Sequence, residues 1–183
     1  MALITLLNAQ LAFGHVALLD HTGFSLETNE RVGLIGRNGA GKSSLFSLLA
    51  GRLQADAGDV EIPPSWLQPG GMAEVAQNMP ETDQSATDFV LEGDTRLAEV
   101  QRQLAEAEAS DDGMAIAQAY SDLHDAGAHA AVARAQALIL GLGFRVSELD
   151  QPVNSFSGGW RMRLQLARAL MCPSDLLLLD EPT

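Results

Sequence analysis

The pattern of apolar and polar positions divides the chain into a strand-rich first part and a helix-rich second part. Residues 3–13 are apolar with polar breaks, and residues 31–35 form a short apolar run that ends at Gly36. Such a run predicts a buried strand that enters a loop. The apolar positions of residues 45–49 suit a helix, and Gly51 is a plausible stop for it.

Residues 95–142 are rich in Ala, Glu, Gln and Leu and change to a helical period. Apolar residues three and four positions apart lie on one face of a helix. Three such stripes follow one another, broken at residues 111–113 and at Gly127. They predict two helices joined by a tight turn and a third helix that returns. The stripes are Leu97, Val100, Leu104 and Ala107; Ile116, Tyr120 and Leu123; and Val132, Ala135, Ile139 and Leu142. An ordinary acidic, solvated helical subdomain is the plainer interpretation of this region.

The last part of the chain predicts a helix followed by a buried strand. Residues 176–179 are four leucines in a row, a fully apolar strand that ends at Asp180. An earlier strand candidate covers residues 72–76. Residues 158–171 predict a helix with one apolar face, made by Trp160, Leu164, Ala167 and Met171.

Residues 36–43 read GRNGAGKS and fit the phosphate-binding loop pattern, with a predicted strand before them and a predicted helix after them. Glycines let the backbone wrap around phosphate oxygens with its N–H groups turned inward, and the helix N-terminus adds partial positive charge. We expect Lys42 to reach the β- and γ-phosphates and the Ser43 hydroxyl to bind Mg²⁺. The other positions expected at the nucleotide are Gly36, Asn38, Gly39, Ala40, Gly41 and Ser44.

Two acids follow the leucine strand. An acid at the C-terminal end of a buried strand lies beside a phosphate loop when both belong to one parallel sheet. Asp180 is therefore a candidate Mg²⁺ ligand, and Glu181 is a candidate general base that polarises the attacking water. Apolar strands that end in acids are common, so this pattern becomes specific only together with residues 36–43.

Ser157, Gly158 and Gly159 open the last predicted helix. A hydroxyl and N–H groups at a helix N-terminus form an anion site. A plain helix cap explains the same residues, because Ser and Gly are both favourable there. For the tripeptide taken alone, the cap is the favoured interpretation.

Charge adds two observations. The chain has 24 acidic residues against 11 Lys and Arg, a net charge of −13, which argues against an unassisted electrostatic grip on nucleic acid or anionic lipid. Residues 61–125 hold 14 of the acids against only Arg96 and Arg102. Lys42 is the single lysine among the 11 cations, and it supplies the compact point charge that a phosphate loop requires.

Three features of the sequence indicate the cellular compartment of the protein. The single cysteine, Cys172, rules out an internal disulfide and suits a reducing environment. No apolar run approaches the length of a membrane span, and the first residues lack the basic region of a secretory signal. We expect a cytoplasmic protein without membrane insertion.

The segments GRNGAGKSS, SFSGGWRMRLQLARAL and LLLLDEPT together resemble the ATP-binding domain of ABC proteins, as the Walker A loop, signature motif and Walker B in that family's order. The resemblance covers essentially the whole chain. It implies ATP and Mg²⁺ as ligands, with Gln77 as the Q-loop glutamine that senses Mg²⁺ and the attacking water. Phe13 is the candidate for the aromatic residue that stacks on adenine, with core packing as an equal alternative.

The implied fold class is α/β, the P-loop NTPase core of an ABC ATPase. The core carries an antiparallel β subdomain and a helical subdomain with an arm-like helical hairpin. On this resemblance, residues 1–183 are one partial ABC domain, truncated at its C-terminal end. Residues 1–91 hold the N-terminal strands, Walker A and Q-loop, residues 92–145 the helical insertion, and residues 146–183 the signature helix and Walker B.

Three features resemble the soluble ABC-F branch of this family. Trp160 stands where transporter subunits usually carry Gln, the insertion between Gln77 and Ser157 is long, and flanking stretches match the branch. The opening LITLLNAQLAFGHVALLD resembles the bacterial Uup-type proteins. Uup-type proteins carry two ABC domains in one chain and are linked to functions on the ribosome or DNA. The resemblance implies the same for this protein. With nine acids against two arginines over residues 92–125, the arm does not look like a grip on a phosphate backbone.

In ABC ATPases the signature of one domain closes over ATP held by the Walker A loop of another. The resemblance therefore places Lys42 and Ser157 in two different composite sites, and the implied partner is a second ABC domain of the same full-length chain. We expect the 183-residue piece alone to have at most trace ATPase activity. Two alternatives stay open: the ATP-binding subunit of a membrane transporter, which Trp160 disfavours, and a non-catalytic nucleotide-gated scaffold, which Glu181 argues against.

Overall fold

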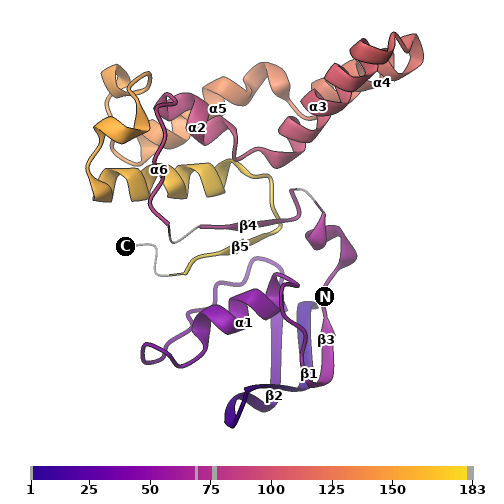
Figure 1. The fold of residues 1–183 in the computed structure, drawn as a ribbon, viewed down its shortest axis with the longest axis vertical. Helices are drawn as coiled ribbons and strands as arrows, with labels where there is room; N and C mark the ends of the chain where they lie inside the picture. The colour runs from indigo at the N-terminus through magenta and orange to yellow at the C-terminus, as the bar shows by residue number, and fades with distance from the viewer. Residues whose placement is uncertain (1, 69, 76–77, 181–183) are drawn as a thin grey trace. The chain divides into compact units, whose positions relative to one another are not determined.

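The computed structural model describes residues 2–68, 70–75 and 78–180. The chain divides between residues 68 and 69 into two compact units, and each is described by itself (Figure 1). The first contains an antiparallel sheet and one α-helix, and the second contains two parallel strands and a set of helices. This combination confirms the predicted α/β class with an antiparallel β subdomain and a helical subdomain.

Three antiparallel strands form the sheet of the first unit, in the order β2-β1-β3. They are β1 (Ala2–Phe13), β2 (Val16–Glu27) and β3 (Ala57–Glu61). The central strand β1 buries Ile4, Leu6, Ala9 and Leu11. Strand side chains alternate between the two faces, so the step from Leu6 to Ala9 departs from strict alternation.

A register shift at Asn8 explains that departure. The pairing of β1 with β2 shifts between Leu6 and Ala9, and Asn8 has a positive φ of 49°. An irregularity of this kind inserts one residue and returns the next apolar residues to the buried face. The neighbouring strand must come close here, because a Cβ on Gly58 would lie 2.2 Å from the Asn8 carbonyl oxygen. Gly58 also has a φ of +80°, so a glycine suits this position on both counts.

The predicted buried strand over residues 31–35 is wrong. These residues are exposed and have no regular structure, and the Ile35 side chain is 96% exposed. A strand exists only where a neighbour accepts and donates its backbone hydrogen bonds. In the described part of the first unit, β1, β2 and β3 pair among themselves, and none of them pairs with residues 31–35.

The helix predicted after the glycine-rich loop is confirmed. It is α1 (Lys42–Leu49), which buries Leu48 and Leu49. The helix ends at Ala50, and the next residue, Gly51, has a φ of +71°, which a residue with a side chain rarely adopts. A short 3₁₀ turn, η1 (Pro64–Leu67), then buries Trp66.

The second unit begins with β4 (Met72–Glu74), which pairs in parallel with β5 (Leu176–Leu178). Both predicted strands are therefore present, each shorter than its apolar run. Beyond Glu74 the pairing continues in one further bond, from the Val75 N–H to the Leu178 carbonyl at 3.1 Å. Because the strands are parallel, their C-terminal ends lie at the same edge of the sheet.

Between β4 and the last helix, the described residues form six helices or 3₁₀ turns. They are α2 (Ala86–Leu91), α3 (Thr95–Ser110), α4 (Gly113–Asp125), α5 (Ala128–Gly141), η2 (Val146–Glu148) and η3 (Val153–Ser155). The helix α6 (Gly158–Met171) has the bounds that the sequence predicts. Leu164 and Ala167 on α6 are fully buried in the core, together with Ile139 of α5 and Val90 of α2.

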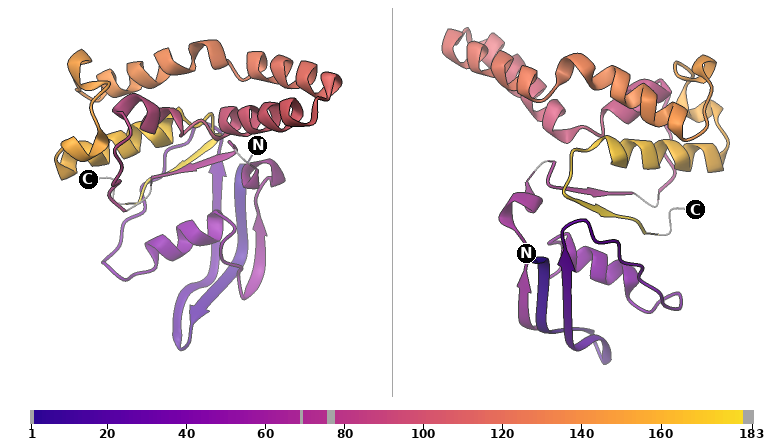
Figure 2. Two further views of the ribbon diagram at one scale, coloured as in Figure 1. Left: turned by 45° about the horizontal axis from the view of Figure 1, so that its top comes forward. Right: turned by 180° about the vertical axis from the view of Figure 1, so that it is seen from behind.

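The predicted pair of helices with a tight turn is also confirmed. Helices α3 and α4 lie side by side and extend beyond the other helices of their unit (Figures 1 and 2). Asp111 closes α3 in the left-handed conformation, with a φ of 55°. Asp112 then caps α4, because its Oδ1 accepts hydrogen bonds from the N–H groups of Met114 (3.0 Å) and Ala115 (3.1 Å). We call α3 and α4 the arm.

Two residues of the predicted stripes are exposed. Tyr120 is 56% exposed, because α4 packs mainly on α3 and buries a narrow face there, at Ala119. Val132 is 48% exposed, because the buried face of α5 follows Ala131, Ala135 and Ile139 instead. A one-position offset turns a helical residue by about 100°, enough to move it out of a narrow stripe.

Arg102, one of the two arginines of the arm, is paired with acidic side chains of its own helix. Arg102 donates to Glu99 at 2.6 Å and also pairs with Glu106, all on exposed α3. The hydrogen bond from Arg102 lowers the pKa of Glu99 below its usual range. The surface of the arm is therefore predominantly acidic. Within the described ranges, no helix is long and apolar enough to cross a membrane.

Candidate functional site

The loop over residues 36–43 curls into the first turn of α1. Gly39 and Gly41 have φ values of +80° and +93°, and the Ala40 N–H donates to the Arg37 carbonyl at 3.1 Å. Gly41 is the N-cap of α1, and its carbonyl accepts the first hydrogen bond of the helix, from the Leu45 N–H at 2.9 Å. The first N–H groups of an α-helix have no acceptor inside the helix, so the N-terminus of α1 favours an anionic ligand.

The Lys42 side chain folds back over this loop. Its Nζ donates to the carbonyl oxygens of Gly36 at 3.1 Å and Arg37 at 3.3 Å. The ammonium group is thereby held at the N-terminus of α1, where both the helix and the side chain favour an anion. The first turn, residues 42–44, contains no acid that would compete.

The backbone of the loop leaves space for phosphate oxygens. Residues 36–40 are exposed, and even a Cβ on Gly36 would make only an ordinary contact with Ala40 Cβ, at 3.4 Å. Gly39 and Gly41 have left-handed φ values that favour glycine, and a Cβ on Gly41 would also lie 2.9 Å from the Leu18 side chain of β2. The residues present therefore fit a phosphate group.

The predicted Mg²⁺ ligands are distributed over the two units. Ser43 is exposed in the first turn of α1. Asp180 lies in the second unit, two residues after β5, and is only 7% exposed. That they bind the same ion stays a prediction. Gln77 and Glu181, the predicted sensor and general base, lie outside the described residues.

Ser157 occupies the N-cap position of α6, with an extended backbone. Among the residues that the structure describes, its side chain makes no capping hydrogen bond, and the residue is exposed. The side-chain hydrogen bond that a plain helix cap would make is therefore not seen at Ser157. Gly158 lies under the Met79 side chain, whose Cε would be 3.0 Å from an added Cβ.

Phe13 lies at the end of β1, where it pairs with Val16 across the turn at Gly14. Its side chain is 53% exposed, so it is not a core residue of the first unit. An exposed aromatic face suits stacking on a base. The contact with adenine stays a prediction.

Two functional candidates were not evident from the sequence. Asn154 and Arg161 flank the signature serine and bind the segment that follows Gln77, at residues 80–83. An Asn in a turn and an Arg on a helix carry no distinctive pattern by themselves. Only the tertiary arrangement distinguishes them.

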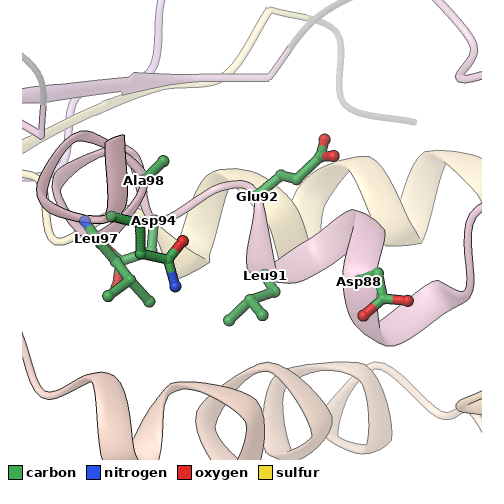
Figure 3. A pocket seen from close by; sticks show the side chains of 7 residues that line it. Asp88, Leu91, Glu92, Asp94, Leu97 and Ala98 are labelled. Carbon is green, nitrogen blue, oxygen red and sulfur yellow. The ribbon is translucent and has the colours of Figure 1, made fainter. Parts of the chain in front are cut away.

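A pocket in the helical unit is a separate feature. Asp88, Glu92 and Asp94 line it together with Leu91, Leu97, Ala98 and Gln101. In Figure 3, Leu91 and Leu97 point toward α5 and Glu92 points the other way. Two of its three carboxylates are ion-paired, Asp94 with Arg134 at 2.7 Å and Glu92 with Arg168 at 3.2 Å, and the lining has no glycine-rich loop like that of residues 36–43.

A glycine-rich loop closed by a lysine at a helix N-terminus defines a P-loop nucleotide-binding domain. The chain belongs to the ABC transporter family, whose model matches residues 19–183. Family membership implies a nucleotide-binding ATPase domain.

Several relatives are similar over nearly the whole chain. The ATP-binding protein YheS of Haemophilus influenzae is 46% identical over 176 residues, which cover 96% of this chain and 27% of that protein. YheS of Escherichia coli K12 is 42% identical, covering 99% and 28%. Human ATP-binding cassette sub-family F member 3 is 39% identical, covering 96% and 24%. The chain thus spans about a quarter of the length of these relatives.

Solved structures show the same fold. An ATP-binding cassette of an ABC transporter superposes with a TM-score of 0.66 at 22% identity, covering 100% of this chain and 70% of that one. The protein cbiO1 of Clostridium perfringens, part of the ABC transporter complex cbiONQ, gives a TM-score of 0.68 at 20% identity, covering 100% and 66%. These likenesses confirm the predicted ABC ATPase fold.

Proposed function

We propose that this chain is the first ATP-binding domain of a tandem ABC-F type ATPase, which acts as an ATP-driven switch on a bound partner. The observation that carries the proposal is the loop over residues 36–43, with the Lys42 ammonium held at the N-terminus of α1. Relatives named YheS and sub-family F member 3 support the branch. The Uup-type resemblance stays a prediction, since these relatives carry other names.

The proposed chemistry starts from binding. The loop amides and the Lys42 ammonium would bind the phosphates of ATP. Ser43 and Asp180 are the residues that would hold Mg²⁺, whose charge would stabilise the transferred phosphoryl group. Glu181 polarises the attacking water, Gln77 senses it, and Phe13 stacks on adenine. Ser157, Gly158 and Gly159 contribute to the composite site of the second ABC domain, so one domain alone turns over ATP at most in traces.

Lys42→Ala tests the loop. A hydrogen bond to a charged group contributes about 1.5–3 kcal/mol, so we expect ATP affinity to fall roughly 10- to 100-fold. Arg37→Ala is the matched control, because Arg37 is an exposed cation of the same loop and is expected to have a much smaller effect. Titration with a fluorescent ATP analogue measures both, and an unchanged affinity in Lys42→Ala contradicts the proposal.

Glu181→Gln in the full-length protein tests catalysis. We expect hydrolysis to be lost while ATP stays bound, which locks the protein in its closed state. A variant that still turns over ATP contradicts the role of Glu181 as general base, and a variant that never closes on ATP contradicts the switch.

The partner is tested by fractionation. We propose a cytoplasmic protein that acts on the ribosome or on DNA. In the ribosomal case the acidic arm favours contact through ribosomal protein, or through its few arginines. Co-sedimentation of the Glu181→Gln variant with ribosomes in ATP supports the ribosomal form of the proposal. Recovery in the membrane fraction instead favours a transporter subunit.

A further inference from the structure

The pocket between α2 and α3 differs in size and chemistry from the phosphate loop. It lies within the helical unit and has a volume of about 200 Å³. Clefts that hold cofactors and drug-sized ligands have volumes of about 300–1,000 Å³. A pocket of this size therefore suits a single amino-acid side chain better than a cofactor.

Two leucines form the apolar part of the lining. Leu97 of α3 is buried, and Leu91 of α2 packs against the core that contains it. In Figure 3 both side chains point toward α5, and Leu91 lies between Asp88 and Leu97. An aliphatic chain that lies along the two leucines therefore ends next to Asp88.

The three carboxylates of the lining are not equivalent. Asp94 is paired with Arg134 at 2.7 Å, and Glu92 is paired with Arg168 at 3.2 Å. Over the ranges that the structure describes, Asp88 is hydrogen-bonded only to a serine and has no cationic partner. The unbalanced negative charge of the pocket therefore resides on Asp88.

The Asp88 carboxylate is exposed, and the first turn of its own helix holds it in place. Its Oδ2 accepts a hydrogen bond from the Ser85 hydroxyl at 2.7 Å, and the same hydroxyl accepts the Asp88 N–H at 3.0 Å. A carboxylate has about four acceptor positions, so one bond leaves room for a bidentate donor. Because the group is already oriented, a ligand does not have to order it on binding.

The charges around the pocket favour a cation as well. Of the seven described residues that line it, none is a lysine or an arginine. Further along α3, Arg102 is shared by Glu99 and Glu106, so two acids against one arginine leave a net charge of −1 there. A negative field attracts basic proteins and repels the phosphates of nucleic acids.

We propose that this pocket is a docking site for an arginine side chain of a protein partner. The methylenes of the arginine pack along Leu91 and Leu97, and its guanidinium group donates two parallel hydrogen bonds to the Asp88 carboxylate. Lysine fits less well, because its ammonium is a compact, strongly hydrated charge without the planar fork of donors. The inference goes beyond the proposed function, since it concerns the helical unit alone and does not depend on ATP.

The test follows the methyl NMR signals of Leu91 and Leu97 in the full-length protein. The probe is a blocked alanine-arginine-alanine tripeptide, and a second tripeptide has lysine in place of arginine. We expect the arginine probe to shift both leucines and not Leu164, which is buried on α6, and the lysine probe to bind roughly tenfold more weakly. Equal affinity for the two probes, or no shift with the arginine probe, overturns the proposal.

Asp88→Asn tests the charge of the pocket. The amide oxygen keeps an acceptor for the Ser85 hydroxyl, so we expect the fold to be preserved and the affinity to fall roughly tenfold. Asp125→Asn is the matched control, because Asp125 is an exposed acid of the same unit that does not line the pocket. Equal losses in the two variants show that only the general field attracts the probe, and they overturn the proposal.

Ala98→Phe tests the shape of the pocket without a change of charge. Ala98 is an exposed lining residue of α3, so a phenylalanine there fills the space beside Leu97 and should abolish binding. Ala105→Phe, at an exposed position of the same helix outside the lining, should bind the probe within about twofold of the wild type. Binding that survives in Ala98→Phe overturns the proposal. A single-stranded DNA oligonucleotide that shifts Leu91 and Leu97 as strongly as the arginine probe also overturns it, because it assigns this surface to nucleic acid.

Discussion

Removal of the Arg134 guanidinium should loosen the base of the arm. Asp94, at the start of α3, is a buried carboxylate with its side chain 3% exposed. Its Oδ1 accepts the Leu97 N–H at 3.0 Å and so caps α3, and its Oδ2 accepts from Arg134 of α5 at 2.7 Å. The two oxygens thus have separate tasks, one in the cap and one in the ion pair.

The expected loss in free energy depends on how far the ion pair between Asp94 and Arg134 is buried. Breaking a fully buried pair costs about 3–5 kcal/mol, whereas an exposed pair contributes about 0–1 kcal/mol. The Arg134 side chain is 45% exposed and the cap survives its removal, so we expect Arg134→Ala to cost about 2 kcal/mol. Asp94→Ala also loses the cap, about 1 kcal/mol more, for a total of about 3 kcal/mol.

Hydrogen exchange of the α3 amides measures this directly in the full-length protein. A loss of about 2 kcal/mol corresponds to exchange roughly 30-fold faster. Arg102→Ala is the control, because its partners Glu99 and Glu106 are on the same exposed helix face and should matter little. If the α3 amides of Arg134→Ala exchange within about threefold of the wild-type rate, the assigned role of the pair is refuted.

Three further substitutions test other parts of the structure. Gly93→Ala should prevent correct folding of the helical unit, because the added Cβ would lie 1.9 Å from the Arg168 carbonyl oxygen; a normal yield with native circular dichroism would contradict this. Leu164→Ala, at a fully buried position on α6, should lower the free energy of unfolding by about 2–5 kcal/mol in urea titrations, and a loss below about 1 kcal/mol would show that the site collapses around the change. Phe13→Ala should weaken ATP binding without changing the melting temperature, because the side chain is half exposed; an unchanged nucleotide affinity would exclude it as the stacking residue.

The helical unit could be predicted closely because its information is local. The apolar spacing of α3 and α6 and the break at residues 111–113 each appear within one or two turns of sequence, and caps such as Asp112 act on their own helix. The phosphate loop could be predicted for the same reason, since its glycines and Lys42 are contiguous.

The remaining features depend on partners that are distant in sequence. Residues 31–35 have the apolar character of a strand, but apolar character does not specify a neighbour that would pair with them. Asn154 and Arg161 are ordinary polar residues in the sequence, and only the fold brings Thr82 and Pro80 within hydrogen-bonding distance of them. The close approach that favours glycine at position 58 comes from the carbonyl of Asn8 on another strand.

The pairing of residues 79–87 with residues 149–161 gives the helical insertion a closed stem. Hydrogen bonds hold together the two ends of the roughly 60-residue insertion. The base of the insertion therefore stays closed whatever the number of residues between its ends. The entropic cost of lengthening such a loop grows only slowly with length. Leu97 and Ala126, at the base of the arm, are part of the core and must stay, but the arm beyond them can be shortened or extended at its tip. This molecule can therefore change its reach toward a partner while the geometry around Ser157 stays the same.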